Sequence, residues 1–247
     1  MRKDEVFEKI EIGEPSTIED VIEGMEALQQ FLGERERYRS LLPFLKAYYR
    51  VTSSVQERKR QGFFDHPGEM DRLDVVFARR YFEPVKEYLD GEDPGRPWSP
   101  YFDYCRRNDS MASLEMMLGI NVHINADLAP ALEEAGFRHR KDYDRINEVL
   151  ESEIVSLLRY LVLNRPDRLN LAAVLMPMVV DREFRNVIVR WRDRTWENRE
   201  AMDLEELQRQ TCEVSRELVE IGHDLNPLNL PHRLKELERL EVSLDRA

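Results

Sequence analysis

Two pairs of polar side chains interrupt an otherwise apolar stretch, Ser110–Gly136. The pairs are Asn121 with Asn125 and His123 with Asp127, each separated by four residues. At about 100° per residue, each pair lies on one face of a helix, and the two faces are roughly 200° apart. A buried polar group without a partner costs about 1–3 kcal/mol, so each pair needs partners. The sequence therefore predicts one polar pair on each side of a buried helix.

The pair His123 and Asp127 has the spacing of two metal ligands on one helix face. Imidazole nitrogen and carboxylate oxygen together suit zinc, iron or manganese. Because a metal site needs three or four protein ligands, other helices must supply the rest. Asp74 is the first candidate, since an aspartate on the flank of an apolar face needs a partner, and Asp65 and His66 are further candidates. The bound metal would activate water, and hydrolysis of an ester or phosphoester is the expected reaction.

Metal-free chemistry is the alternative for the same residues. His123 would act as a general base, Asp127 would orient its ring, and Asp74 or Asn125 would bind the substrate. A tailoring enzyme of this kind would take a hydrophobic small molecule into an apolar pocket lined by methionine and aromatic side chains. The candidate substrate contacts are Asn121, Asn125, Trp98 and Tyr81.

A non-catalytic protein also fits the pattern. The polar pairs would then form a satisfied buried network that fixes the register of the helix in a binding or scaffold protein. The bond between His123 and Asp127 would be structural in that case. A closed core around His123 would favour this hypothesis, whereas a cavity that reaches the imidazole would favour an enzyme.

The charge of the chain argues against two classes of partner. The 247 residues carry a formal net charge of −12, whereas nucleic acids and anionic membranes attract basic surfaces.

Cys105 and Cys212 have no metal or redox spacing and fit a reducing compartment. The chain opens without the apolar core of a signal peptide and has no apolar run of about 18 residues. We therefore expect a soluble, cytoplasmic protein that acts on a small molecule, with its oligomeric state left open.

Helical periodicity runs through most of the chain, and no segment shows a convincing period of two. We expect a loose arm over 1–15 and a single all-α domain over 16–247. The domain should be a bundle of seven to eight helices around the buried helix at about 110–136. A capping-box pattern at Ser16 opens the first helix. Pro84 and Pro177 should bend or interrupt their helices. The other expected helices span about 36–60, 68–89, 142–164, 169–196, 203–223 and 231–244.

Several motifs resemble a bacterial family, the domain of unknown function numbered 5995. The resemblance covers roughly residues 20–200, and its most specific part is His123-Ile124-Asn125-x-Asp127-Leu128. Because that family has no assigned activity, the resemblance supports the fold and the site but implies no reaction. Further matching segments are Phe63-Phe64-Asp65, Leu73-Asp74-Val75-x-Phe77-Ala78-x-x-Tyr81, Trp98, Ile146-Asn147 and Trp191–Trp196.

The run Leu118-Gly119-x-x-x-His123-x-x-x-Asp127-Leu128-x-Pro130 is also similar to the zinc-binding helix of the phospholipase C and single-strand nuclease superfamily. That superfamily is all-α and hydrolyses phosphodiesters with clustered zinc ions, so the resemblance implies that His123 and Asp127 ligate metal. The histidine that follows the proline in the superfamily is Ala131 or Leu132 here, and no second His-x-x-x-acid pair occurs. At most one or two ions would therefore be held.

Overall fold

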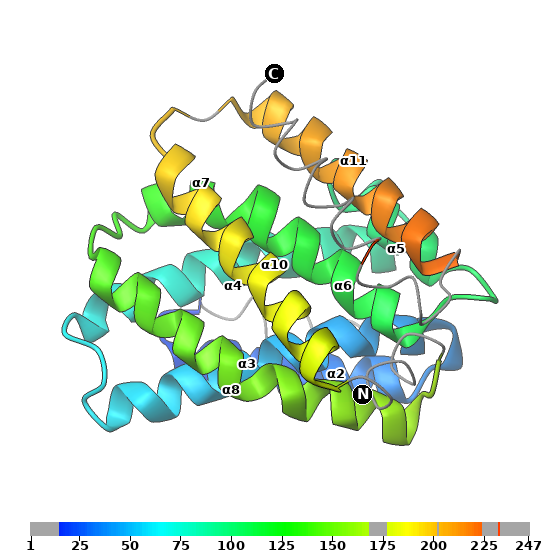
Figure 1. Ribbon diagram of the computed structural model, residues 1–247, viewed down its shortest axis with the longest axis horizontal. Coiled ribbons are helices and arrows are strands. Elements are labelled where there is room, and N and C mark those ends of the chain that lie inside the picture. The colour runs from blue at the N-terminus through cyan, green and yellow to red at the C-terminus, as the bar shows by residue number, and fades with distance from the viewer. Residues whose placement is uncertain (1–14, 168–176, 202, 224–231, 233–247) are drawn as a thin grey trace.

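A buried central helix organises the protein (Figure 1). The computed structural model describes residues 15–167, 177–201, 203–223 and 232. In it, α6 (Ala112–Val122), η2 (His123–Asp127) and α7 (Leu128–Glu134) follow one another without a break. Every residue from Met111 to Ala129 is buried except Ile120. The stretch lacks a solvated face because it lies in the middle of the molecule, as its apolar composition predicts.

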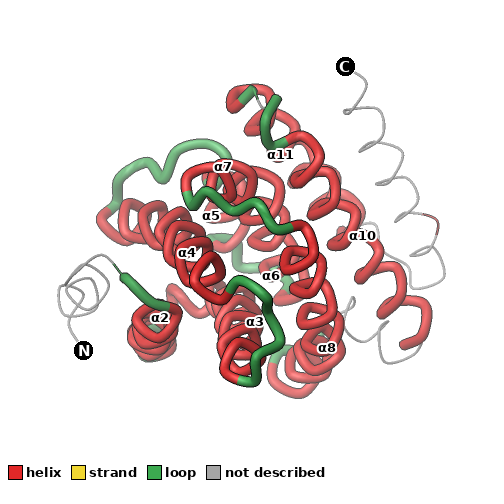
Figure 2. Tube along the Cα trace, turned by 90° about the vertical axis from the view of Figure 1, so that its left-hand side faces the viewer, coloured by secondary structure: helices red, strands yellow, loops and turns green. Residues whose placement is uncertain are grey.

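The remaining helices surround this one on all sides. They are α2 (Ile18–Gly33), α3 (Leu42–Arg60), α4 (Pro67–Asp90), α5 (Ser99–Cys105), α8 (Arg140–Asn164), α10 (Pro177–Asn198) and α11 (Leu204–His223). Counted with α6, η2 and α7 as one helix, the described residues form eight helices and no strand (Figure 2). Their buried side chains join in one hydrophobic core. The prediction of an all-α bundle of seven to eight helices is confirmed.

Several predicted helix boundaries need correction. The cap of α2 is Thr17 rather than Ser16, since the Thr17 hydroxyl accepts from the Asp20 backbone and the Asp20 carboxylate accepts from the Thr17 backbone. Residues Glu36–Leu41 form a separate 3₁₀ turn, η1, before α3 begins. Pro84 does not interrupt α4, because buried neighbours on both sides hold the helix in place to Asp90. The predicted arm over 1–15 lies outside the described residues except at residue 15. The start of the helix predicted over 169–196, residues 169–176, lies outside them too, as does the helix predicted over 231–244 except at residue 232.

The turn that carries the polar pairs is a π-helix, which the sequence does not predict. It covers His123–Asp127 and lies between two α-helical segments. A π-turn closes its hydrogen bonds between residues five apart, and single turns of this kind occur often at functional sites. His123, Asn125 and Asp127 lie within this turn, and Asn121 lies two residues before it.

Close approach of α3 to α6 fixes the position of this turn. A Cβ atom built on Gly119 would lie 2.3 Å from Cγ of Phe44 on α3, far inside a normal contact distance. The Phe44 ring in turn packs against Tyr81 and Trp98, with centroids 5.1 and 5.9 Å away. Only glycine at position 119 allows the two helices to lie this close.

We predict that Gly119→Ala lowers the free energy of unfolding by about 1–3 kcal/mol, since the added methyl group must push α3 and α6 apart. Urea unfolding measures the change. The matched control is Gly33→Ala at the end of α2, where nothing lies within 4 Å of the added Cβ atom. Equal stability of the two variants would contradict the close packing.

Candidate functional site

A hydrogen-bonded triad lies on the side of the π-turn that faces α3, α4 and α5. His123 Nδ1 and Asp127 Oδ2 are 3.0 Å apart, and Trp98 Nε1 donates to the same oxygen at 3.2 Å. All three side chains are buried. Indole nitrogen can only donate, so Oδ2 of Asp127 acts as an acceptor there. We assign the His123 proton to Nδ1, which lets Oδ2 accept a second bond and leaves Nε2 with its lone pair.

Aromatic rings enclose the imidazole of His123. The ring of Phe77 stacks on it at a centroid distance of 3.6 Å and an angle of 11°. The ring of Tyr48 meets it edge-on at 4.5 Å. Phe44 and Tyr81 complete the cage at 5.7 and 6.2 Å. This apolar cage keeps water from the ring and makes a charge on it costly.

Burial shifts the pKa of both partners away from the charged form. Burial lowers the pKa of His123 well below its usual range, and the charge of Arg80 lowers it further. The same burial raises the pKa of Asp127, while Arg80 and the Trp98 hydrogen bond act in the opposite direction. At neutral pH the imidazole is therefore uncharged, the form in which Nε2 can accept a proton.

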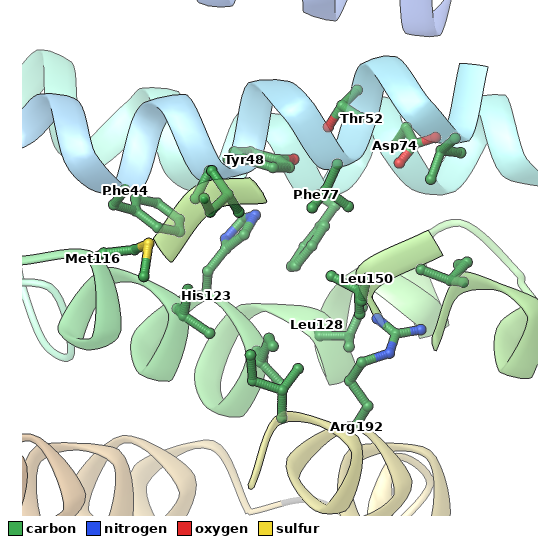
Figure 3. A pocket seen from close by; sticks show the side chains of 18 of the residues that line it. Phe44, Tyr48, Thr52, Asp74, Phe77, Met116, His123, Leu128, Leu150 and Arg192 are labelled. Carbon is green, nitrogen blue, oxygen red and sulfur yellow. The ribbon is translucent and has the colours of Figure 1, made fainter. Parts of the chain in front are cut away.

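A cavity of about 90 Å³ reaches His123 between α3, α4, α6, α8 and α10 (Figure 3). Most of its wall is apolar, with Phe44, Leu128 and Leu150 among the lining side chains. Its polar lining comes from Tyr48, Thr52, Asp74, His123 and Arg192. Figure 3 shows His123 on one side and Asp74 and Arg192 on the other, with Phe77 between them. The cavity thus places polar groups from four helical segments, α3, α4, η2 and α10, around one apolar space.

Three buried polar atoms on this cavity have no hydrogen-bond partner among the described residues. They are Nε2 of His123, the hydroxyl of Tyr48 and Oδ2 of Asp74. Buried polar atoms in native proteins are nearly always bonded, and a catalytic role or a bound ligand is among the explanations for an exception. Three exceptions around one cavity therefore mark it as the candidate site.

The carboxyl of Asp74 titrates near neutrality. Burial raises its pKa to about 7, and nearby Asp71 raises it too, whereas Lys59 and Arg192 act in the opposite direction. Burial, together with Asp74 and Asp127, raises the pKa of Tyr48 well above its usual range, so its hydroxyl keeps its proton. The cavity hence offers a base at His123 and two groups that can donate a proton in a hydrogen bond.

The second polar pair lies on the opposite side of the π-turn and is bonded to protein. Asn121 donates to the Thr211 carbonyl at 3.1 Å and to the Ser215 hydroxyl at 2.9 Å, both on α11. Asn125 donates to Asn121 at 2.7 Å and accepts from Arg194 of α10 at 2.9 Å. Neither asparagine lines the cavity. The structure gives both a role in fastening α10 and α11 to the central helix.

The other predicted site residues fall into two groups. Trp98 and Tyr81 pack around His123 without lining the cavity, and only Trp98 bonds to the triad. Asp65 and His66 lie in the loop before α4, where their backbone nitrogens donate to the buried carboxylate of Asp142 at 2.9 and 2.8 Å. These two residues fix the start of α4 and are not brought to His123.

The predicted metal ligands do not assemble. His123 and Asp127 bond to each other, and Phe77 stacks on the imidazole between His123 and Asp74. Among the residues that the structure describes, no group of three or more His, Cys, Asp or Glu side chains could hold a metal ion. The metal site predicted from His123, Asp127, Asp74, Asp65 and His66 stays a prediction.

Fold and site together define an all-α bundle with a cavity that reaches a buried histidine. The chain belongs to the family described as "Family of unknown function (DUF5995)", which matches residues 18–224. The motif around His123 predicts this family, and that recognition is confirmed. The similarity to the phospholipase C and single-strand nuclease superfamily is not shown. No curated protein and no solved structure matches the chain.

No helix in the described ranges is long and apolar enough to cross a membrane.

Three residues of the cavity carry no signal that the sequence analysis used. Tyr48 and Phe77 belong to the apolar stripes of α3 and α4, where aromatic side chains usually form core. Arg192 follows Ile188 by four residues on α10, and both line the cavity. A cation on the buried face of an amphipathic helix is the one available sign, since arginine is seldom fully buried without a partner.

We predict a pH-dependent stability that originates at Asp74. Its pKa is 3.8 in the unfolded chain and about 7 in the folded protein. Between these values the folded state binds more protons, so the free energy of unfolding falls as pH rises from about 4 to about 7. Asp74→Asn should lack this pH-dependent part of the free energy of unfolding. The part amounts to up to a few kcal/mol, since each unit of pKa shift is worth about 1.4 kcal/mol.

Urea unfolding at a series of pH values measures the effect. The matched control is Asp103→Asn, which removes an exposed carboxylate on α5 and should keep the wild-type profile. Parallel pH profiles for wild type and Asp74→Asn would show that Asp74 ionises normally.

Proposed function

We propose that the protein is an enzyme that performs metal-free acid–base chemistry on a small hydrophobic molecule. The observation that carries this proposal is the state of His123. Its Nδ1 is fixed by Asp127, while its Nε2 is buried on a cavity without a protein partner. A histidine oriented in this way by a carboxylate is the arrangement that general-base catalysis uses.

His123 is the base in this proposal. Nε2 takes a proton from a C–H or O–H group of the substrate, and the electron pair of that bond stays on the substrate. The imidazolium that forms is stabilised by the hydrogen bond to Asp127, whose position Trp98 holds. Asp127 and Trp98 are positioning residues, because they act on the substrate only through His123.

Asp74 supplies a proton to a different atom of the substrate from the one that His123 deprotonates. With a pKa of about 7, its carboxyl is half protonated at neutral pH. A general acid transfers protons most effectively when its pKa lies near the working pH, as that of Asp74 does. The Tyr48 hydroxyl donates a hydrogen bond to negative charge that develops on the substrate between them. The proton balance closes when His123 and Asp74 exchange protons with product or solvent.

Cavity size limits the substrate. An engineered cavity of about 150 Å³ holds benzene, so about 90 Å³ holds fewer than six heavy atoms of comparable packing. Val51, Phe77 and Leu150 line the cavity and are partly exposed. A larger substrate would place only its reacting end inside and leave the rest at this rim.

The cavity also weighs against the two alternative hypotheses. A structural network would satisfy its buried polar atoms, whereas three atoms around this cavity have no protein partner. Hydrolysis with a metal would need a third ligand close to His123 and Asp127, and Asp74 is separated from them by Phe77. Metal-free acid–base chemistry needs only the groups that line the cavity.

We predict that Nε2 of His123 carries no proton at neutral pH, while Nδ1 does. Long-range proton–nitrogen NMR spectra of protein labelled on histidine nitrogen distinguish the two forms, and the missing signal of His123→Gln assigns the resonance. His139→Gln removes a partly exposed histidine and serves as the control. A protonated Nε2 at pH 7 would exclude His123 as the base.

We also predict activity in a proton-exchange assay. The full chain should accelerate deuterium exchange next to the carbonyl of acetone or 2-butanone in heavy water, and proton NMR follows this exchange. His123→Gln should lose about 10²–10⁴-fold of this rate, the usual contribution of a general base. His139→Gln and addition of a chelator should leave the rate unchanged. Loss of the rate with the chelator would favour the metal-dependent alternative.

A further inference from the structure

A buried cation lies across the cavity from His123. Arg192 of α10 is 4% exposed and lines the same space (Figure 3). Two contacts with α8 hold its guanidinium: Nε donates to the Asn147 side chain at 2.7 Å, and one Nη donates to the Tyr143 carbonyl at 3.2 Å. The Tyr143 ring lies 4.2 Å from the guanidinium carbon. These contacts fix the group rigidly, but all of them are with neutral partners.

No carboxylate of the described residues pairs with Arg192. The acids near it on α8 and α10, Asp144 and Asp193, both pair with Arg140 instead. Asp74 lines the same cavity, but its Oδ2 makes no hydrogen bond, and with a pKa of about 7 only about half of its carboxyl is ionised at neutral pH. A buried charge is costly unless an opposite charge meets it in good geometry. Within the cavity, Asp74 therefore compensates the positive charge of Arg192 only in part.

The free part of the guanidinium has the geometry of an anion site. Arginine carries five N–H donors in a planar fork, and two of them serve Asn147 and Tyr143. The remaining donors have no acceptor among the described residues. A planar fork matches a carboxylate, which can accept two parallel bonds. The apolar wall beside it, with Leu128, Leu150 and Ile188, suits a hydrocarbon chain rather than a strongly hydrated anion.

We propose that the cavity binds a short hydrophobic carboxylic acid as its anion, with Arg192 as the counter-ion. This inference rests on the proposed function, since it names the substrate class of the same site. The carboxylate at Arg192 directs the hydrocarbon chain along the apolar wall toward His123 and Asp74. The carbons nearest His123 are then the ones that exchange protons, and Arg192 determines which end of the substrate enters.

Calorimetric titration of the full chain tests the proposal with propanoate, its neutral isostere propanamide, and inorganic phosphate. Propanoate has five heavy atoms and therefore fits the cavity. It should bind at least about tenfold more tightly than propanamide, because a charge-assisted pair with a buried arginine is lost in the amide. Phosphate should bind more weakly than propanoate. Absence of saturable propanoate binding at millimolar concentration, or equal affinity for propanamide, overturns the proposal. Tighter binding of phosphate overturns the hydrophobic class.

Substitution of the arginine locates the interaction. Arg192→Gln should weaken propanoate binding at least about tenfold and leave propanamide binding unchanged, and Arg192→Lys should retain part of the difference. Arg106→Gln, which removes an exposed arginine at the C-terminal end of α5, is the matched control. Unchanged propanoate affinity in folded Arg192→Gln overturns the assignment.

Wild-type protein gives a measurement that does not depend on the folding of a variant. Propanoate should shift the NMR signals of the Leu128 and Leu150 methyl groups and of the Arg192 guanidinium, and propanamide should not shift the guanidinium. Shifts confined to other residues overturn the site. The protonation state of His123 is a separate readout, so propanoate binding with a protonated Nε2 would contradict the proposed catalysis alone. An unprotonated Nε2 without propanoate binding would contradict the substrate class alone.

Discussion

Burial of the central helix obliges its polar side chains to find partners on other helices, and those bonds hold the bundle together. Asn121 bonds to α11 and Asn125 to α10. Glu115 forms an ion pair with Arg165 at the end of α8. Asp127 accepts from Trp98 beside α5. Each bond removes a desolvation penalty and fixes the rotation of the helix, so the same residues that make burial costly also determine the packing.

Three buried polar atoms at the cavity lack such partners among the described residues. Nε2 of His123, the Tyr48 hydroxyl and Oδ2 of Asp74 belong to side chains that line a common space. Natural proteins violate the rule at functional sites and offset the cost elsewhere. The stacked ring of Phe77 and the triad with Trp98 provide compensating contacts here.

Periodicity predicted most of the fold. Helix positions follow from apolar residues at helical spacing, and the central helix follows from the absence of a solvated face, both of which are local properties. The details of the helices that the sequence did not predict depend on contacts with other helices. Pro84 stays within α4 because packing holds the helix, and the 3₁₀ turn before α3 and the π-turn at His123 are set by contacts that a single helix does not contain. Local pattern decides that a helix forms, and tertiary packing decides its irregularities.

The sequence by itself determined the all-α class, the family, and the two opposed polar pairs on the buried helix. Spacing alone places His123 beside Asp127, because residues four apart meet on one helix face. Which pair faces a cavity is decided only by the tertiary structure, since α10 and α11 fill the space beside Asn121 while α3, α4 and α8 leave space beside His123. The same applies to Tyr48 and Arg192. Their side chains reach the cavity from helices distant in sequence, and no local pattern encodes the angle at which those helices pack.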